Sequence, residues 1–206
     1  MVRRGNKKGQ IVVVSGPSGV GKSTVISEVR TQRSGLTFSI SYTTRKPRVG
    51  EENHVHYHFV DVEMFQKMIA EDAFLEYACY QNNYYGTAKA DVEALRDQGN
   101  DVLLDIEVQG AANVRRQCPD ATLIFVIPPS FSELSRRLHG RQSETEEVIQ
   151  GRLNRAREEY KEIPKYDYLV VNDKVSKAAE EMLAILRAQE CRVSTRLDLI
   201  KGDVTL

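Results

Sequence analysis

A phosphate-binding pattern, G-x-x-x-x-G-K-[ST], lies near the start of the chain in Gly16-Pro17-Ser18-Gly19-Val20-Gly21-Lys22-Ser23. Glycines in such a loop let backbone N–H groups turn toward phosphate oxygens, because no Cβ atom stands in the way. We expect Lys22 to reach the β- and γ-phosphates of a nucleoside triphosphate, and the hydroxyl of Ser23 to ligate Mg²⁺. With Thr24, which follows directly, residues 16–24 form the predicted triphosphate site.

The segments on either side of this loop are of the kind that the pattern requires. Residues 11–14 are a short apolar run rich in β-branched side chains, typical of a buried parallel strand. From Ser23 to about Arg30 the apolar residues recur at helical spacing. A helix that begins here offers its positive N-terminal end to the anion. The context therefore favours a phosphate-binding loop over a glycine-rich turn without a ligand.

The rest of the chain mostly alternates between strands and helices. Apolar, strand-sized runs occur at residues 102–106, 123–127 and 168–171. Helical patterns fall between and after them, at residues 88–98, 111–117, 131–138, 146–162 and 175–190. Such alternation predicts an α/β fold with a parallel sheet flanked by helices. Asp105 ends one strand and is expected near the metal, as a carboxylate that follows a buried strand.

One region breaks the alternation. Between Phe38 and Tyr85 the signals are short strands, at 38–41, 57–60 and 74–77, interrupted by a helical stretch at 62–70. We therefore expect one domain over residues 1–206. It has a core at about 8–37 and 88–206, a small mixed α+β insertion at about 38–87, and a short lid at about 138–152.

Composition narrows the class of protein. The chain carries 29 basic and 29 acidic side chains, and this balance argues against a general nucleic-acid binder. Its three cysteines form no CxxC pair, which favours a reducing compartment. The basic start lacks an apolar signal region, and the apolar runs are too short to span a bilayer. We expect a cytoplasmic protein without membrane partners. The sequence does not decide whether the chain forms a homo-oligomer.

Several spaced segments resemble the guanylate kinases, a family of P-loop nucleoside monophosphate kinases. Ser41-Tyr42-Thr43-Thr44-Arg45-Lys46-Pro47-Arg48 is similar to the family's S-x-T-T-R-x-P-R. Further segments match at the family's spacing: Gly50-Glu51, Tyr57, Phe74-Leu75-Glu76, Asn83-Tyr84-Tyr85-Gly86-Thr87, Asp105-Ile106-Glu107-Val108-Gln109-Gly110, Ile127-Pro128-Pro129-Ser130 and Val171-Asn172-Asp173. The resemblance covers about residues 10–190. It implies Mg²⁺-assisted, in-line transfer of the γ-phosphoryl group of ATP to GMP or dGMP, within purine nucleotide metabolism and GMP recycling.

The resemblance also implies a GMP site. The phosphate of GMP would be bound by Arg45, Arg48, Tyr57 and Tyr85, because guanidinium groups and phenol hydroxyls donate hydrogen bonds that suit a dianion. Glu76 would accept hydrogen bonds from N1–H and N2–H₂ of guanine, and Ser41 and Thr87 would donate toward O6. Asp105 and Glu107 complete this set, and Asp105 would share Mg²⁺ with Ser23, directly or through water.

The transferring phosphate would be neutralised by cationic side chains. Lys22, Arg45 and three arginines that resemble the family's lid residues, Arg137, Arg141 and Arg152, are the predicted catalytic residues, and Asn172 would contact the adenine of ATP. The chain departs from the family's usual pattern at residues 53–57, at 141–143, and at Glu107, where Asp is usual. The longer carboxylate leaves open how Glu107 meets ribose or metal-bound water.

Four alternatives remain at this point. One is a kinase for AMP or a pyrimidine nucleotide. A second is a guanylate-kinase-like module that binds phosphopeptides without catalysis, although such modules typically lose the loop lysine or its glycines. A third is a GTPase, against which Asn172-Asp173-Lys174 fails to match the Asn-Lys-x-Asp guanine signature. Finally, the alternation of His54, His56 and His58 would place all three on one face of a strand. Three imidazoles on one face could bind a metal ion, but a half-exposed edge strand explains the pattern better.

Overall fold

The structure is a computed structural model that describes residues 8–80, 82–140 and 145–196. Contacts divide the chain into two compact units. The first joins the residues up to Ser15 with Gly35–Leu123, and the second joins Gly16–Ser34 with the residues from Ile124 onward. Arg141 and the other residues at 141–144, which belong to the predicted lid, lie outside the described residues.

A five-stranded sheet has the order β2-β7-β1-β8-β9. Its strands are β1 (Ile11–Ser15), β2 (Leu36–Phe38), β7 (Asp101–Asp105), β8 (Thr122–Ile127) and β9 (Tyr168–Val171). β1 and β2 each pair in parallel with β7, and β8 pairs in parallel with β9. The apolar runs that predicted β1, β7 and β8 are buried, as expected where both faces of a parallel sheet are covered, whereas Leu169 and Val171 of β9 are exposed.

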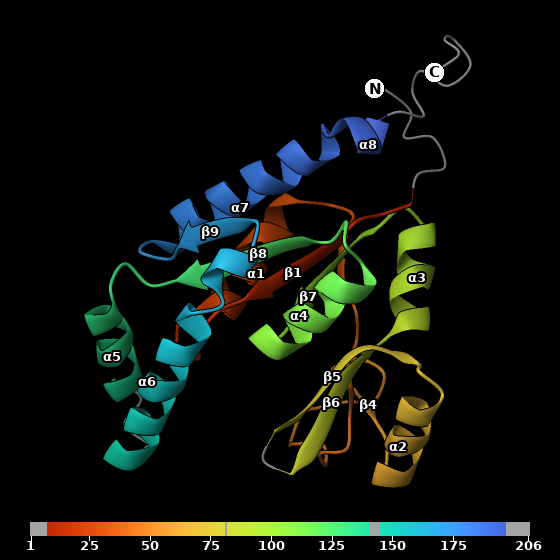
Figure 1. Cartoon of the computed structure of the whole chain (residues 1–206), viewed down its shortest axis with the longest axis horizontal. Helices are drawn as coiled ribbons and strands as arrows, with labels where there is room; N and C mark the ends of the chain where they lie inside the picture. The colour runs from red at the N-terminus through yellow and green to blue at the C-terminus, as the bar shows by residue number, and fades with distance from the viewer. Residues whose placement is uncertain (1–7, 81, 141–144, 197–206) are drawn as a thin grey trace. The chain divides into compact units, whose positions relative to one another are not determined.

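The first unit also contains a mixed sheet of order β4-β3-β6-β5. Its strands are β3 (Tyr42–Thr43), β4 (His58–Phe59), β5 (Phe74–Tyr80) and β6 (Asn83–Ala88), and the last two form a long antiparallel hairpin (Figure 1). Helices α2 (Val62–Ala70), α3 (Lys89–Asp97) and α4 (Val108–Gln117) belong to the same unit. Phe65 of α2 is fully buried and stacks on Phe74 with ring centroids 4.4 Å apart.

The second unit is mainly helical. It contains α1 (Lys22–Gln32), α5 (Phe131–His139), α6 (Glu146–Tyr160), η1 (Ile163–Lys165), α7 (Val175–Glu190) and α8 (Val193–Arg196). α1 packs on α7, and α5 and α6 lie side by side around a buried cluster of leucine, isoleucine and alanine side chains (Figure 1). Ser130 caps α5, since its hydroxyl accepts a hydrogen bond from the N–H of Glu133 at 3.1 Å.

The predicted α/β class and most predicted elements are confirmed, with several differences, among them a strand β3 at Tyr42–Thr43 where the sequence predicted one at 38–41. Phe38 ends β2, which belongs to the parallel sheet rather than to the small mixed one. β6 was not expected as a strand. His54 and His56 lie in a turn closed by hydrogen bonds to Glu52 and Tyr57, so they do not alternate with His58 along one strand. His54 takes a left-handed backbone conformation, with φ of 64°, which an extended strand excludes.

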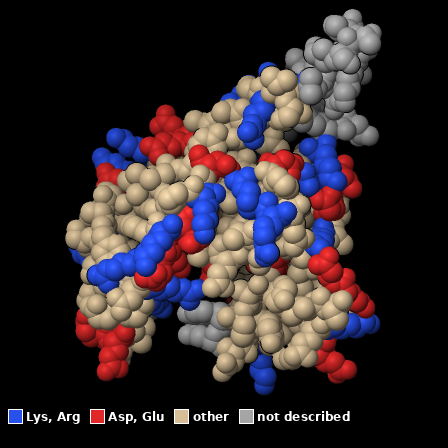
Figure 2. Space-filling model, in the orientation of Figure 1, with Lys and Arg blue, Asp and Glu red and all other residues tan. Residues whose placement is uncertain are grey.

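Charge is well mixed over the face of the molecule that Figure 2 shows, where Lys and Arg lie among Asp and Glu. In the part of the chain that the structure describes, every helix is too short or too polar to span a lipid bilayer. The three cysteines are free thiols.

Candidate active site in two halves

The phosphate loop lies in the second unit, between the end of β1 and the start of α1. Within it, the N–H of Val20 donates to the carbonyl of Pro17 at 3.3 Å, and Lys22 Nζ donates to the carbonyl of Gly16 at 2.7 Å. Ser23 and Thr24 are exposed in the first turn of α1. Strand, loop and helix therefore follow one another as the motif predicts, and the hydroxyl of Ser23 is accessible to a ligand.

Gly21 is required at its position for two reasons. Its φ of 90° is unfavourable for other residues, and a Cβ atom there would lie 2.6 Å from Nδ2 of Asn172. The Asn172 side chain is buried and donates from Nδ2 to the carbonyl of Val20 at 2.8 Å. Asn172 thus supports the loop directly.

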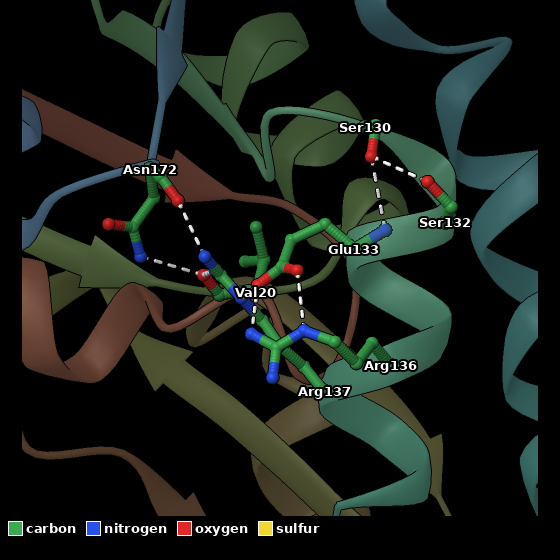
Figure 3. A network of polar contacts seen from close by, with 7 residues as sticks. All are labelled: Val20, Ser130, Ser132, Glu133, Arg136, Arg137 and Asn172. Carbon is green, nitrogen blue, oxygen red and sulfur yellow. Dashed lines mark hydrogen bonds and ion pairs between the residues drawn. The ribbon is translucent and has the colours of Figure 1, made fainter.

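Arg137 lies on α5 and binds the same loop (Figure 3). Its NH1 donates to the carbonyl of Val20 at 3.1 Å, and its NH2 donates to the carbonyl of Asn172 at 3.0 Å. Its Nε donates to Glu133 at 2.7 Å. Arg152 of α6 reaches the loop more weakly, donating to the hydroxyl of Ser18 at 3.3 Å. Two of the three predicted lid arginines therefore gather at the phosphate loop, and Arg141 lies outside the described residues.

In the first unit, Arg45 is held by a carboxylate that sequence analysis mentioned only as part of a motif. Both terminal nitrogens of Arg45 donate to Glu51, each at 2.9 Å, and NH1 also donates to the carbonyl of Lys46. Glu51 accepts a further hydrogen bond from the N–H of Arg48 at 2.7 Å. The hydrogen bonds from Arg45, and then from Arg48, lower the pKa of the Glu51 carboxyl to about 2. Glu51 therefore stays charged and orients the arginine.

The predicted phosphate-binding tyrosines lie beside Arg45. The rings of Tyr57 and Tyr85 meet edge to face with centroids 6.1 Å apart, and the guanidinium of Arg45 is 5.4 Å from the centroid of Tyr57. Burial raises the pKa of the Tyr57 hydroxyl, so it stays a hydrogen-bond donor at neutral pH. Arg48 is exposed on the same loop. The structure thus brings together Arg45, Tyr57 and Tyr85.

The predicted base readers form a second group in this unit. Glu76 of β5 and Thr87 of β6 are cross-strand partners, and both are buried. The Thr87 hydroxyl donates to Oε1 of Glu76 at 2.6 Å. Burial, chiefly, raises the pKa of the Glu76 carboxyl, and the nearby charge of Glu107 raises it further. Ser41 is half-buried, and its carbonyl accepts from the N–H of His58 at 2.9 Å.

Gly110 of α4 gives the Glu76 carboxylate its space. A Cβ atom at residue 110 would lie 2.6 Å from Oε2 of Glu76 and 3.3 Å from its carboxyl carbon. Any larger residue would therefore displace the carboxylate. This explains in physical terms why glycine suits the end of the segment from Asp105 to Gly110.

Two acidic residues follow the buried strand β7. Asp105 is its exposed last residue, and Glu107 is the exposed N-cap of α4. The hydroxyl of Ser23 and the carboxylate of Asp105 are hard oxygen donors, the type that Mg²⁺ prefers. Ser23 belongs to the second unit and Asp105 to the first. In the described ranges, no three His, Cys, Asp or Glu side chains are grouped so as to hold a metal ion.

The three histidines make contacts that sequence analysis did not anticipate. His54 and His58 approach with their Nδ1 atoms 2.7 Å apart, and the His58 ring lies 4.4 Å from that of Tyr42. His56 Nδ1 instead accepts from the N–H of Glu52 at 3.0 Å. Because His56 turns to its own loop, the three imidazoles do not converge.

Three residues that shape the site received no role from the sequence: Glu51, Gly110 and Glu133. Glu133 precedes Arg137 by four positions on a helix, which is a recognised pairing distance. A glycine inside a helical pattern, as at Gly110, is a recognised sign of close packing. Glu51 offered no comparable signal, because its pairing with Arg45 depends on the path of a loop.

Comparisons with known proteins identify the family of the chain. The guanylate kinase family model matches residues 8–189. The guanylate kinase of Neisseria gonorrhoeae is 48% identical over 194 residues, covering 94% of this chain and 95% of the relative. That of Syntrophotalea carbinolica is 48% identical over 188 residues, covering 91% and 90%.

A solved structure extends the agreement to the fold. The guanylate kinase from Anaplasma phagocytophilum superposes with a TM-score of 0.75 at 30% identity and covers 95% of both chains. The resemblance seen in the sequence motifs is therefore confirmed over nearly the whole chain. The chain belongs to the guanylate kinase family and is an enzyme with the activity of that family, the ATP-dependent phosphorylation of GMP.

Proposed function

We propose that the chain transfers the γ-phosphoryl group of ATP in line to GMP or dGMP, giving ADP and GDP or dGDP. The observation that carries the choice of guanine is the buried pair of Glu76 and Thr87. A carboxylate in this position accepts from N1–H and N2–H₂ of guanine together. Adenine presents an unprotonated N1, so it would leave the charge unpaired, at a cost of at least about 1–3 kcal/mol.

Thr87 first orients the carboxylate. A threonine hydroxyl has one hydrogen, and that of Thr87 is donated to Glu76. We infer that guanine binding frees this hydrogen to turn toward O6, while Ser41 supplies a second donor. Glu76, Thr87 and Ser41 would thus contact the base, and Arg45 would contact the phosphate, so neither set involves the 2′-hydroxyl of ribose. Since dGMP keeps both groups, we propose it as an additional substrate, with Asp105 and Glu107 left for ribose or metal-bound water.

The GMP phosphate is bound by Arg45, Arg48, Tyr57 and Tyr85 in this proposal. The support for it is the contact of Arg45 with the Tyr57 ring, the contact of that ring with Tyr85, and the two hydrogen bonds by which Glu51 holds Arg45. The second pKa of a phosphate monoester is about 6, so the acceptor is already ionised near neutral pH. The reaction therefore needs no general base.

The ATP phosphates are bound by residues 16–24 and neutralised by Lys22, Arg137, Arg152 and Arg141. Phosphoryl transfer depends on positioning and charge neutralisation rather than on covalent chemistry. Mg²⁺ supplies Lewis-acid neutralisation of phosphate oxygens, and Ser23 and Asp105 are the residues proposed to hold it. We place Asn172 beside the adenine, in addition to its bond to the loop.

The division into core, GMP-binding insertion at 38–87 and lid at 138–152 is proposed on the same grounds. We infer that the insertion and lid close on the substrates and exclude water, which limits ATP hydrolysis. Small-angle scattering with and without both nucleotides tests this closure. An unchanged radius of gyration would argue against it.

The cellular setting follows from the reaction. We propose a role in purine nucleotide metabolism that returns GMP to the diphosphate pool, in the cytoplasm. ATP and GMP are the partners that the family membership gives. The free thiols support a reducing compartment. Independence from nucleic acids and membranes stays a prediction, and a homo-oligomer stays open.

A coupled assay for ADP production, with MgATP and separate GMP, dGMP, AMP, CMP, UMP and TMP, tests the substrate assignment. We expect turnover with GMP, weaker turnover with dGMP, and almost none with the others. Turnover with another nucleotide would remove the proposed role of Glu76. Folded protein that turned over none, yet bound nucleotide in a titration, would favour the non-catalytic binding module.

A further inference from the structure

The carbonyl oxygen of Val20 is held from outside the phosphate loop. Nδ2 of Asn172 donates to it at 2.8 Å and NH1 of Arg137 donates to it at 3.1 Å (Figure 3). Because a peptide group is planar and trans, the N–H of Gly21 points away from this carbonyl. Fixing the carbonyl therefore fixes the direction of a backbone N–H in an anion-binding loop.

Arg137 is held in turn by three acceptors on three different nitrogens. Besides NH1, its NH2 donates to the carbonyl of Asn172 at 3.0 Å and its Nε donates to Oε1 of Glu133 at 2.7 Å. A guanidinium group is rigid and planar, so an acceptor at Nε sets the directions of the other two nitrogens. Glu133 thus determines how Arg137 faces the loop.

Glu133 is itself well fixed. Its backbone N–H is capped by Ser130, and its two carboxylate oxygens accept from Arg136 at 2.7 Å each. Hydrogen bonds from Arg136 and Arg137 lower the pKa of this carboxyl to about 2, so it is charged at every pH of interest. A pair of this type on a helix surface contributes little to stability. Its importance here is geometric, because one of its arginines binds the loop.

We propose that Glu133 is a positioning residue for the phosphate loop: through Arg137 it sets the direction of the Val20–Gly21 peptide group and thereby the affinity for ATP. The inference rests on the proposed function, in which this loop binds the ATP phosphates. Glu133 influences the nucleotide only through Arg137. It acts on ATP binding and leaves GMP binding unchanged.

The test compares single substitutions at Glu133 and Arg136, using initial rates and ATP binding by calorimetry without GMP. E133A should raise the Kd and KM for ATP about tenfold and change the KM for GMP less than about twofold. E133Q, which keeps an acceptor at the same place, should recover most of the affinity. R136A removes the other arginine bound to Glu133 but keeps the contact of Glu133 with Arg137, so it should raise the Kd for ATP less than E133A does. E158A, which removes an exposed carboxylate paired with Lys161, is the matched control and should bind ATP like the unmodified protein.

A double substitution tests whether Glu133 acts through Arg137. In an R137A background, E133A should cause no further loss of ATP affinity, because the two residues act as one unit. A further tenfold loss would overturn the proposal, as would normal ATP affinity in E133A or an equal rise in both KM values. If E133A failed to fold, E133D would replace it, since Asp keeps the charge but is one methylene too short to reach Arg137. Failure of the unmodified enzyme to bind ATP would instead refute the proposed function.

Discussion

Each half of the site holds an arginine with a carboxylate, but the two arginines are used differently. Arg45 and Glu51 lie on one loop, and their contacts leave the guanidinium beside the Tyr57 ring. Arg137 is tied to Glu133 along a helix and turns its remaining nitrogens to backbone carbonyls. In the proposed assignment, the GMP half would bind its ligand chiefly through side chains. The ATP half would combine cationic side chains with a backbone loop whose shape other side chains maintain.

This difference predicts how substitutions should divide between the two substrates. Residues proposed to bind GMP should affect GMP kinetics, and residues that form or support the phosphate loop should affect ATP kinetics. A residue of the transferring machinery should affect turnover itself.

The largest effect is expected for Lys22→Ala. Removing a cation that neutralises the transferring phosphate should lower kcat by about 10²–10³-fold, because such electrostatic stabilisation acts mainly in the transition state. The fold should persist, since Lys22 contacts the carbonyl of Gly16 through the terminal Nζ of a half-buried side chain and belongs to no buried apolar cluster. Steady-state rates measure the loss of kcat, and thermal unfolding measures whether the fold is kept. Lys161→Ala, on the exposed surface of the same unit, is the control, and retained turnover in Lys22→Ala would refute the assignment.

The second largest effect is expected for Glu76→Gln, which should change the kinetics for GMP and not those for ATP. The amide presents an N–H toward the N1–H and N2–H₂ donors of guanine, so kcat/KM for GMP should fall by about 10²–10⁴-fold. The KM for ATP should not change. Selectivity for GMP over AMP, measured in the same assay, should fall too, and unchanged selectivity would exclude Glu76 as the base reader. Exposed Glu71→Gln provides the control.

Gly110→Ala separates helix stability from GMP binding. Ala is favoured over Gly inside a helix by about 0.5–1 kcal/mol, but here its Cβ would meet the Glu76 carboxylate. We expect the KM for GMP to rise about tenfold while the fold is retained. Gly151→Ala, on α6, is the matched control, because a Cβ there meets nothing within 4 Å. Equal GMP kinetics in the two variants would show that Glu76 moves aside at no cost.

Much of the framework behind this comparison could be predicted from the sequence. Buried strands such as β7 and β8 are predictable because each is a run of apolar residues. The helix predicted at residues 62–70 has the same bounds as α2. β6 was missed because its polar residues and Gly86 lack an apolar pattern, and it is fixed by pairing with β5. The turn around His54 was missed because alternation in sequence does not report a left-handed residue.

The site was predictable by residue type but not by partner. The motifs identify Arg45, Glu76 and Arg137 as candidates. They do not show that Glu51 and Glu133 orient the arginines, or that Gly110 makes room for Glu76. Those relations depend on contacts between side chains brought together by the fold, which spacing along the chain does not encode.

The smallest expected effect is one of pH, and it sharpens the contrast between the halves. Burial raises the pKa of Glu76 above its ordinary value of 4.5, and only the charged form accepts both guanine donors. As pH falls toward this raised pKa, Glu76 gains a proton, so kcat/KM for GMP should fall. The nucleotide phosphates titrate in the same pH range and affect the Glu76→Gln variant equally. The ratio of kcat/KM of the unmodified enzyme to that of Glu76→Gln, taken at each pH, therefore isolates the titration of Glu76. Glu51 and Glu133, whose pKa values are about 2, stay charged throughout. The arginines of both halves therefore remain fixed, and the loss should appear for GMP alone. A parallel loss of ATP affinity would place the titrating group outside the base-reading pair.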